Sequence, residues 1–220
     1  MAAVRGERLT DTGVAPGGAR EGTEGRADAG ASASPRTAAV VAGAALAAMA
    51  VIAPIGMLVA LPDGQFALAG VVALTVAILD VVAAVAVWAW LRADSPLGAP
   101  IVAALRIAYA AVFAGAAGSL VAPADPDRFS AIWDAGLFVF GAHLIALGVV
   151  AVRAGRLPSW IGMLVVLSGA GYATDTVLAL AAPTSSVSIG TVSFVGEVVL
   201  IVWLIVWGGR ARTAPAAEGR

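Results

Sequence analysis

The sequence contains no cysteine and only one histidine, His143. A chain without cysteine has no disulfides and no thiolate metal sites, and a single histidine cannot supply a cluster of histidine ligands. We therefore expect no metal site and no bound cofactor. Charged residues are also scarce, at 12% of the chain, and they nearly balance to a formal net charge of -1. That charge gives no reason to expect a nucleic-acid partner.

Hydrophobic residues, in contrast, make up 60% of the 220 residues, and the mean hydropathy is +0.95. A soluble domain of this size could not hide so much apolar surface from water. The composition predicts a polytopic membrane protein whose main partner is the lipid bilayer. All the basic residues are arginine, and alanine, valine and glycine dominate, which favours a GC-rich bacterial genome and hence the bacterial cytoplasmic membrane.

Apolar segments of about 20 residues or more recur six times, and each is long enough to cross a bilayer as a helix. Short connections rich in proline, glycine and aspartate separate them. The predicted fold is all-α, a bundle of six transmembrane helices over residues 37–209. Residues 1–36 lack apolar periodicity and are predicted to form a disordered tail, and residues 210–220 form a second tail. The predicted segments are 37–60, 66–91, 98–121, 131–152, 158–181 and 189–209.

The arginines predict the orientation of the bundle. They concentrate in the two tails and in the second and fourth connections, whereas the opposite side carries only Arg128. By the positive-inside rule both tails are cytoplasmic, as an even number of spans requires.

Two carboxylates, Asp175 and Glu197, lie within the last two predicted helices. An ionisable group in a membrane segment is costly and is read first as a functional candidate. Each lies about 7 or 8 residues from the outer end of its helix, or roughly 10 to 12 Å deep, so they share one level. Tyr172 shares a helix face with Asp175. If the two faces meet, the carboxyls could hold one proton between them as a relay, cation site or general acid. The alternative is that each forms hydrogen bonds that only lock helices together.

A second polar group pairs Asp80, in the middle of the second segment, with Arg106 in the third. The hairpin between these segments brings the two residues within about one helical turn, and an arginine side chain can cover that distance. The simpler hypothesis is an ion pair that neutralises both charges. The functional alternative is an anion or lipid-headgroup site with Arg106 as its cation, assisted by Tyr109.

His143 and Asp134 lie nine residues apart in the fourth segment. At about 100° per residue this spacing puts them on opposite helix faces, so they do not form a catalytic dyad on one helix. We interpret His143 as a hydrogen-bonded packing residue and keep both as weaker site candidates.

Three stretches together resemble the bacterial membrane proteins of the domain-of-unknown-function-4386 (DUF4386) family. They are LRIAYAAVF from Leu105, VRAGRLPSWIG from Val152 and EVVLIVWLIVWGG from Glu197. The resemblance covers about residues 37–209 and implies a six-helix membrane domain with Arg106 and Glu197 as candidate positions. The family often has a glutamate three residues after the arginine of the third helix, where this chain has Tyr109.

No soluble catalytic signature is present: the chain has no phosphate loop, no nucleophile elbow and no zinc-ligand spacing. Catalytic residues are therefore not assigned. We favour a binding or transport module for a proton, an ion or a small amphiphile. One alternative is an intramembrane enzyme that acts on a lipid or isoprenoid by general acid catalysis. The other is a structural or regulatory membrane protein. The sequence does not define an oligomeric state.

Overall fold

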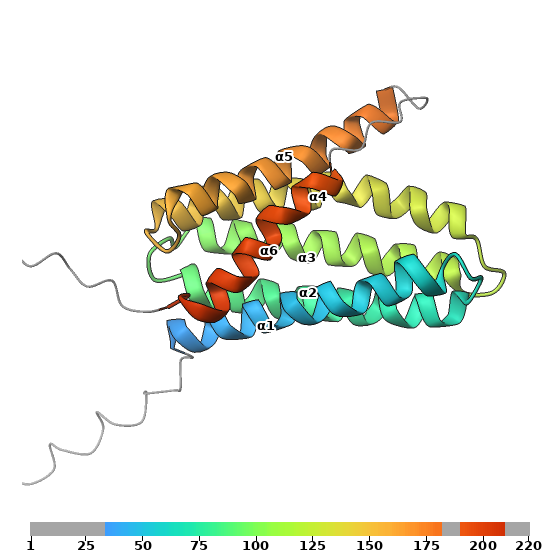
Figure 1. Ribbon diagram of the computed structural model, residues 1–220, viewed down its shortest axis with the longest axis horizontal. Helices are drawn as coiled ribbons and strands as arrows, with labels where there is room; N and C mark the ends of the chain where they lie inside the picture. The colour runs from blue at the N-terminus through green and yellow to red at the C-terminus, as the bar shows by residue number, and fades with distance from the viewer. Residues whose placement is uncertain (1–33, 182–189, 210–220) are drawn as a thin grey trace, which may run out of the picture. The chain divides into compact units, whose positions relative to one another are not determined.

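The structure, a computed structural model, describes residues 34–181 and 190–209, and all its regular elements in these ranges are helical (Figure 1). The predicted tails therefore lie outside the described residues, except for residues 34–36, which lead into the first helix, and so does the connection at 182–189. The all-α fold class is confirmed. The elements are α1 (Pro35–Pro54), η1 (Ile55–Ala60), α2 (Phe66–Leu91), α3 (Gly98–Ala117), η2 (Gly118–Leu120), α4 (Pro126–Arg153), α5 (Ser159–Ala181) and α6 (Gly190–Val206).

In the described part of the chain, five helical stretches are long and apolar enough to cross a membrane: α1 with η1, α2, α3 with η2, α4 and α5. Large apolar side chains such as Ile78, Leu167 and Val71 are exposed on their outer faces, where lipid would cover them. Helix α6 has 17 residues, or about 25 Å at 1.5 Å per residue, and begins directly after the undescribed residues 182–189. That it also spans the bilayer stays a prediction.

The ends of the helices follow from local chemistry. Helix α2 has the predicted bounds, but α4 begins five residues before the predicted start at 131. Asp125 caps it, because its side chain accepts a hydrogen bond from the Arg128 N–H at 2.9 Å, and Pro126 occupies the first turn, where no N–H is needed. The first helix is regular only to Pro54, after which a π-helical turn continues to Ala60. Proline removes a backbone donor, a common cause of such irregularities.

The six helices form a closed ring in which each packs against its neighbours in sequence, and α6 packs against α1 to complete it. Helix α6 crosses obliquely from α5 to the beginning of α1 (Figure 1). Glycines allow both approaches: a Cβ at Gly196 would collide with the backbone of Leu164 on α5, and one at Gly208 would collide with Ala39 on α1.

Among the helix pairs, α4 and α5 pack against each other most extensively. Gly141 and Gly148 lie seven residues apart on α4, and Gly162 and Gly169 lie seven apart on α5. A Cβ at Gly141 would lie 2.5 Å from the carbonyl oxygen of Gly169, and one at Gly148 would lie 2.7 Å from that of Gly162. Small residues let helix backbones approach this closely in membranes, so the glycines set the α4 and α5 spacing.

Arg36 ties the ends of the ring together. Its guanidinium donates to the backbone carbonyls of Leu204, Ile205 and Gly208 at the end of α6, the shortest contact being 2.6 Å to Ile205. These carbonyls have no partner within the helix, and a cation suits the negative end of the helix dipole. The chain then turns at Gly209, whose φ of 83° favours glycine.

Candidate functional site

A cavity of about 460 Å³ lies inside the ring and has lining residues from all six helices. Its walls are mostly apolar side chains, many of them from α1 and α6, such as Leu46, Met49 and Leu200. Its polar lining residues come from α2 to α6. They are Asp80, Arg106, Tyr109, Trp133, Tyr172, Asp175 and Glu197.

The predicted ion pair between Asp80 and Arg106 is confirmed. The Arg106 Nη2 lies 2.5 Å from the Asp80 Oδ1, and the two residues are only 4% and 2% exposed. Asp80 is on α2 and Arg106 on α3, so the pair also joins these helices. Because each charge is matched inside the protein, the pair offsets much of the cost of placing either group in a membrane.

His143 on α4 extends this pair into a network that sequence analysis did not find. Its Nε2 lies 3.2 Å from the Nη1 of Arg106, and its Nδ1 lies 2.9 Å from the carbonyl oxygen of Val102. The carbonyl can only accept and the guanidinium can only donate, so the geometry requires a neutral imidazole with its proton on Nδ1. His143 is fully buried. It is a hydrogen-bonded core residue, as interpreted from the sequence, and it fixes the orientation of Arg106.

Glu197 on α6 and Tyr172 on α5 form the second polar contact at the cavity. The Tyr172 hydroxyl donates to the Glu197 Oε1 at 2.8 Å. Both side chains are half-buried, and Tyr172 is the one hydrogen-bond partner that the described residues give Glu197. A carboxylate has room for several donors, so this contact satisfies only part of its accepting capacity. The remaining capacity is available to a molecule in the cavity.

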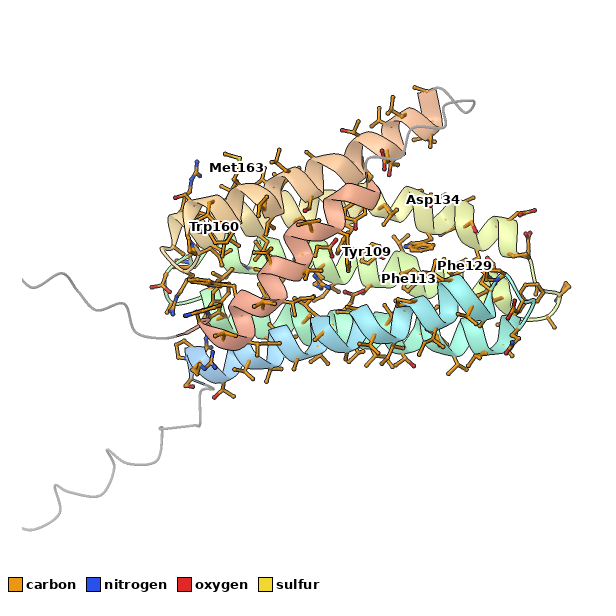
Figure 2. The ribbon with its side chains drawn as sticks, viewed as in Figure 1. Tyr109, Phe113, Phe129, Asp134, Trp160 and Met163 are labelled. Atoms are coloured by element: carbon orange, nitrogen blue, oxygen red, sulfur yellow. The ribbon has the colours of Figure 1, made fainter. Side chains whose placement is uncertain are left out.

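Asp175 and Asp134, the other sequence candidates in α4 and α5, differ in position. Asp175 is partly buried and lines the same cavity as Glu197. Asp134 is exposed on α4 (Figure 2) and is not a lining residue. Its backbone carbonyl accepts a hydrogen bond from Thr176 at 3.0 Å. The structure therefore brings the two expected carboxylates, Asp175 and Glu197, to one cavity, and places Asp134 outside it.

Aromatic rings form a continuous part of the cavity wall. The Phe140 ring lies 4.8 Å from Tyr109 and 5.4 Å from Tyr172, measured between ring centroids. The Trp133 Nε1–H donates to the Tyr109 hydroxyl at 3.2 Å, which fixes both rings. Figure 2 shows Tyr109 within the bundle, whereas Trp160 lies near the beginning of α5 and is exposed. Tyr109 thus contributes an oriented ring at the position where the family that the sequence resembles often has glutamate.

The cavity is open on one side, where exposed apolar residues form part of its lining. Leu58, in the π-helical turn after α1, is 74% exposed, and Phe194, near the beginning of α6, is 49% exposed. The oblique path of α6 separates it from this end of the first helix (Figure 1). Exposed apolar side chains therefore form part of the edge of the cavity.

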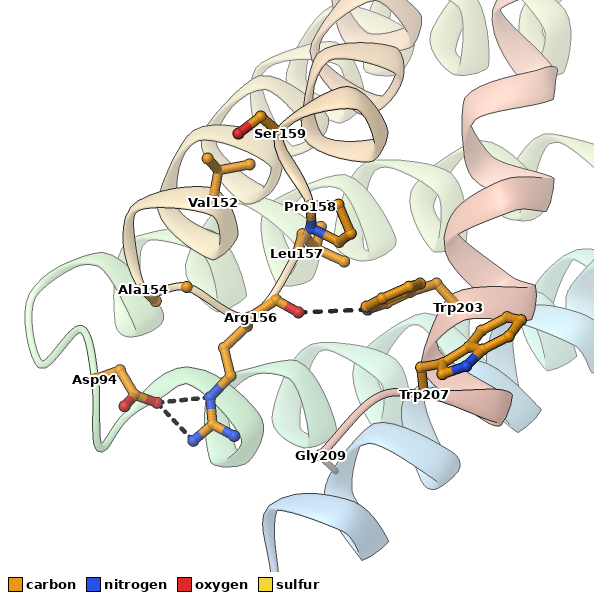
Figure 3. A pocket seen from close by; sticks show the side chains of 11 residues that line it. Asp94, Val152, Ala154, Arg156, Leu157, Pro158, Ser159, Trp203, Trp207 and Gly209 are labelled. Atoms are coloured by element: carbon orange, nitrogen blue, oxygen red, sulfur yellow. Dashed lines mark hydrogen bonds and ion pairs between the residues drawn. The ribbon is translucent and has the colours of Figure 1, made fainter. Parts of the chain in front are cut away.

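A separate pocket of about 580 Å³ lies at the end of the ring that carries Arg156 and the end of α6 (Figure 3). Arg156 pairs with Asp94 through Nη2 and Nε, at 2.6 and 2.7 Å, and so links the α2–α3 and α4–α5 connections. The Trp203 Nε1–H donates to the Arg156 carbonyl at 3.3 Å. The arginine is thus already neutralised, and these contacts fasten the connections to α6.

A metal site is not visible in the described ranges, where no three histidine, aspartate or glutamate side chains gather closely enough to hold an ion. The central site is instead a polar cavity with one buried ion-pair network, one carboxylate held by a tyrosine, and an aromatic wall. This arrangement can bind a molecule by apolar contact, hydrogen bonding and charge.

The fold and the site define a multi-pass helical membrane protein with a polar cavity inside its helix ring. Its family follows from comparison with known proteins. Residues 126–208, which include Tyr172, Asp175 and Glu197, match the sequence model of the protein family described as "Domain of unknown function (DUF4386)". A protein of Archaeoglobus fulgidus described as "Uncharacterized protein" is 37% identical over 131 residues, which span 60% of this chain and 78% of that protein. The chain belongs to the DUF4386 family. No solved structure matches it.

Proposed function

We propose that the protein binds a small amphiphilic molecule in the cavity inside its helix ring. The observation that carries this proposal is a cavity of about 460 Å³ to which all six helices contribute and whose mostly apolar lining includes Glu197. Ligand sites typically occupy about 300–1,000 Å³ and combine apolar walls with a few convergent polar groups. The central cavity fits both parts of this description.

The polar residues divide into a structural network and a group that faces the ligand. Asp80, Arg106 and His143 largely satisfy one another and hold α2, α3 and α4 together. Glu197 and Tyr172 sit on the other side of the ring and use only part of their hydrogen-bonding capacity on each other. A protein that needed Glu197 only to lock helices would gain by pairing it fully, because unpaired polar groups in hydrocarbon are costly.

The opening beside Leu58 and Phe194 supports entry from the bilayer rather than from water. An amphiphile dissolved in the membrane already lies at this depth, with its chain among lipid tails. It can slide between the first helix and α6 and place its chain against Met49 and Leu200. Its polar group then meets Glu197 and Tyr172 without passing through water.

The test is equilibrium binding to the purified protein in lipid nanodiscs, with radiolabelled dodecylamine and dodecanol as probes and empty nanodiscs as the reference. We expect at least one probe to bind saturably above the reference. Ala50→Phe fills the cavity from α1 and should abolish saturable binding. Ala44→Phe adds the same ring on the exposed face of α1 and should leave it unchanged. If neither probe binds saturably to the wild-type protein, the proposal is wrong.

A further inference from the structure

We infer that the polar group of the bound amphiphile is a cationic amine, held by the Glu197 carboxylate against the aromatic wall of the cavity. This inference rests on the proposed binding function and names its ligand class. Two independent features of the site carry it: the balance of charge along the lining, and the aromatic faces beside Glu197.

The charges on the cavity lining are unequal. Among the described residues that line it, the carboxylates Asp80 and Glu197 lie with one guanidinium, that of Arg106. Asp80 already pairs with Arg106 at 2.5 Å, so this guanidinium is neutralised. Glu197 receives one hydrogen bond from a neutral tyrosine hydroxyl. An incoming ammonium group would supply the opposite charge and further donors to this carboxylate.

The aromatic wall provides a second reason for a cation. Tyr172 donates to Glu197, and its ring lies 5.4 Å from Phe140, which in turn lies 4.8 Å from Tyr109. The faces of aromatic rings attract cations, and sites that combine such rings with a carboxylate suit alkylammonium groups. In this protein the carboxylate and the rings are joined by a direct hydrogen bond, so one bound group can contact both.

An anionic headgroup fits the same wall poorly. Among the described lining residues its cationic partner would be Arg106, whose charge is already paired with Asp80 and whose Nη1 also contacts His143. The Nε of Arg106 is buried and has no partner among the described residues. An anion that approached this guanidinium would compete with Asp80 for its charge. The anion would also lie beside the Glu197 carboxylate in the same cavity.

The experiment compares amphiphiles that share one chain and differ in headgroup. Dodecylamine, dodecyltrimethylammonium, dodecanol and dodecanoate are titrated into the nanodisc-embedded protein, each against empty nanodiscs. We expect both cations to bind more tightly than dodecanol by about tenfold or more. Dodecylamine adds a charge-assisted hydrogen bond to Glu197, whereas dodecyltrimethylammonium has no N–H and is attracted by its charge to the carboxylate and the aromatic faces. We expect dodecanoate to bind more weakly than dodecanol. Because these titrations use the wild-type protein, they do not depend on any variant that fails to fold.

Glu197→Gln keeps the acceptor for Tyr172 but removes the charge. It should weaken dodecylamine binding by about tenfold or more and leave dodecanol binding within about twofold. The matched control is Asp134→Asn, which removes a carboxylate of the same bundle that does not line the cavity, and it should change neither.

The outcomes separate the two proposals. If dodecanol or dodecanoate binds as tightly as dodecylamine, or if Glu197→Gln binds dodecylamine like the wild type, the cationic headgroup is wrong and the amphiphile cavity stands. If no amphiphile binds saturably, the binding function itself fails.

Discussion

The buried ion pair gives a stability prediction that can be worked out from its contacts. Asp80 and Arg106 are 2% and 4% exposed and approach to 2.5 Å, and Arg106 also contacts His143 at 3.2 Å. Removing one member of such a pair leaves an uncompensated buried charge, at a cost of about 3–5 kcal/mol. Asp80→Leu should cost more than Arg106→Leu, because a carboxyl can be neutralised by a proton whereas a guanidinium cannot be deprotonated in a protein.

The double variant separates charge from packing. Replacing both residues by leucine removes both charges and leaves mainly the His143 Nε2 without its donor, at a cost of about 1–3 kcal/mol. The double variant should therefore be more stable than Asp80→Leu alone, with a coupling of several kcal/mol in a double-mutant cycle. The assay is equilibrium unfolding in mixed micelles, with Asp134→Leu as the exposed-carboxylate control. Losses that simply add would mean that the pair does not form, and the reasoning about the site's charge would fail with it.

Two further predictions concern how the ring is held together. Gly169→Leu should destabilise the protein by about 1–3 kcal/mol or more, because its Cβ would collide with a backbone carbonyl on α4. A Cβ at Gly115 meets open space, so Gly115→Leu should be nearly neutral in the same unfolding assay. Arg36→Gln should release the end of α6, so hydrogen exchange at residues 204–208 should become faster while exchange in the middle of α2 stays unchanged. Equal exchange rates at 204–208 in the variant and the wild type would show that the Arg36 contacts do not hold α6.

Much of the fold was predictable from the apolar segments and from the proline, glycine and aspartate residues that interrupt them. Helix α2 matches the predicted bounds because Pro62 to Gln65 and Arg92 to Pro96 interrupt an otherwise apolar run at both ends. The apolar run of the fourth segment begins at 131, but the helix itself begins earlier because Asp125 and Pro126 initiate it through capping. The oblique path of α6 could not be predicted, because it depends on close contacts at Gly196 and Gly208 with two different helices.

The site was predictable in its components and not in its connections. The hairpin between α2 and α3 put Asp80 and Arg106 at one level, and the ion pair follows from that register. The link from Arg106 to His143 escaped prediction because the face that α4 turns toward α3 depends on helix rotation, which a nearly uniform apolar sequence does not indicate. The glycines spaced by seven residues on α4 and α5 were the available signal, since they mark the faces on which these two helices meet.

The same limit applied to the aromatic wall. Tyr109, Phe140 and Tyr172 come from three different helices, so no spacing along the chain relates them. Tyr172 was recognised through its shared face with Asp175, yet its hydrogen bond goes to Glu197 on the next helix. Periodicity identifies residues on one helix face, and only the packing of helices decides which residue on a neighbouring helix they contact.

The most direct test of the central claim is to locate a bound amphiphile by photolabelling. Diazirine analogues of dodecylamine and dodecanol would be irradiated with the protein in nanodiscs, and the labelled peptides identified by mass spectrometry. Binding inside the helix ring predicts labelling of cavity residues around Met49 and Leu200 that an excess of the unmodified amphiphile removes. Labelling spread over outward-facing residues such as Ile101 and Leu167, and unchanged by the competitor, would contradict it.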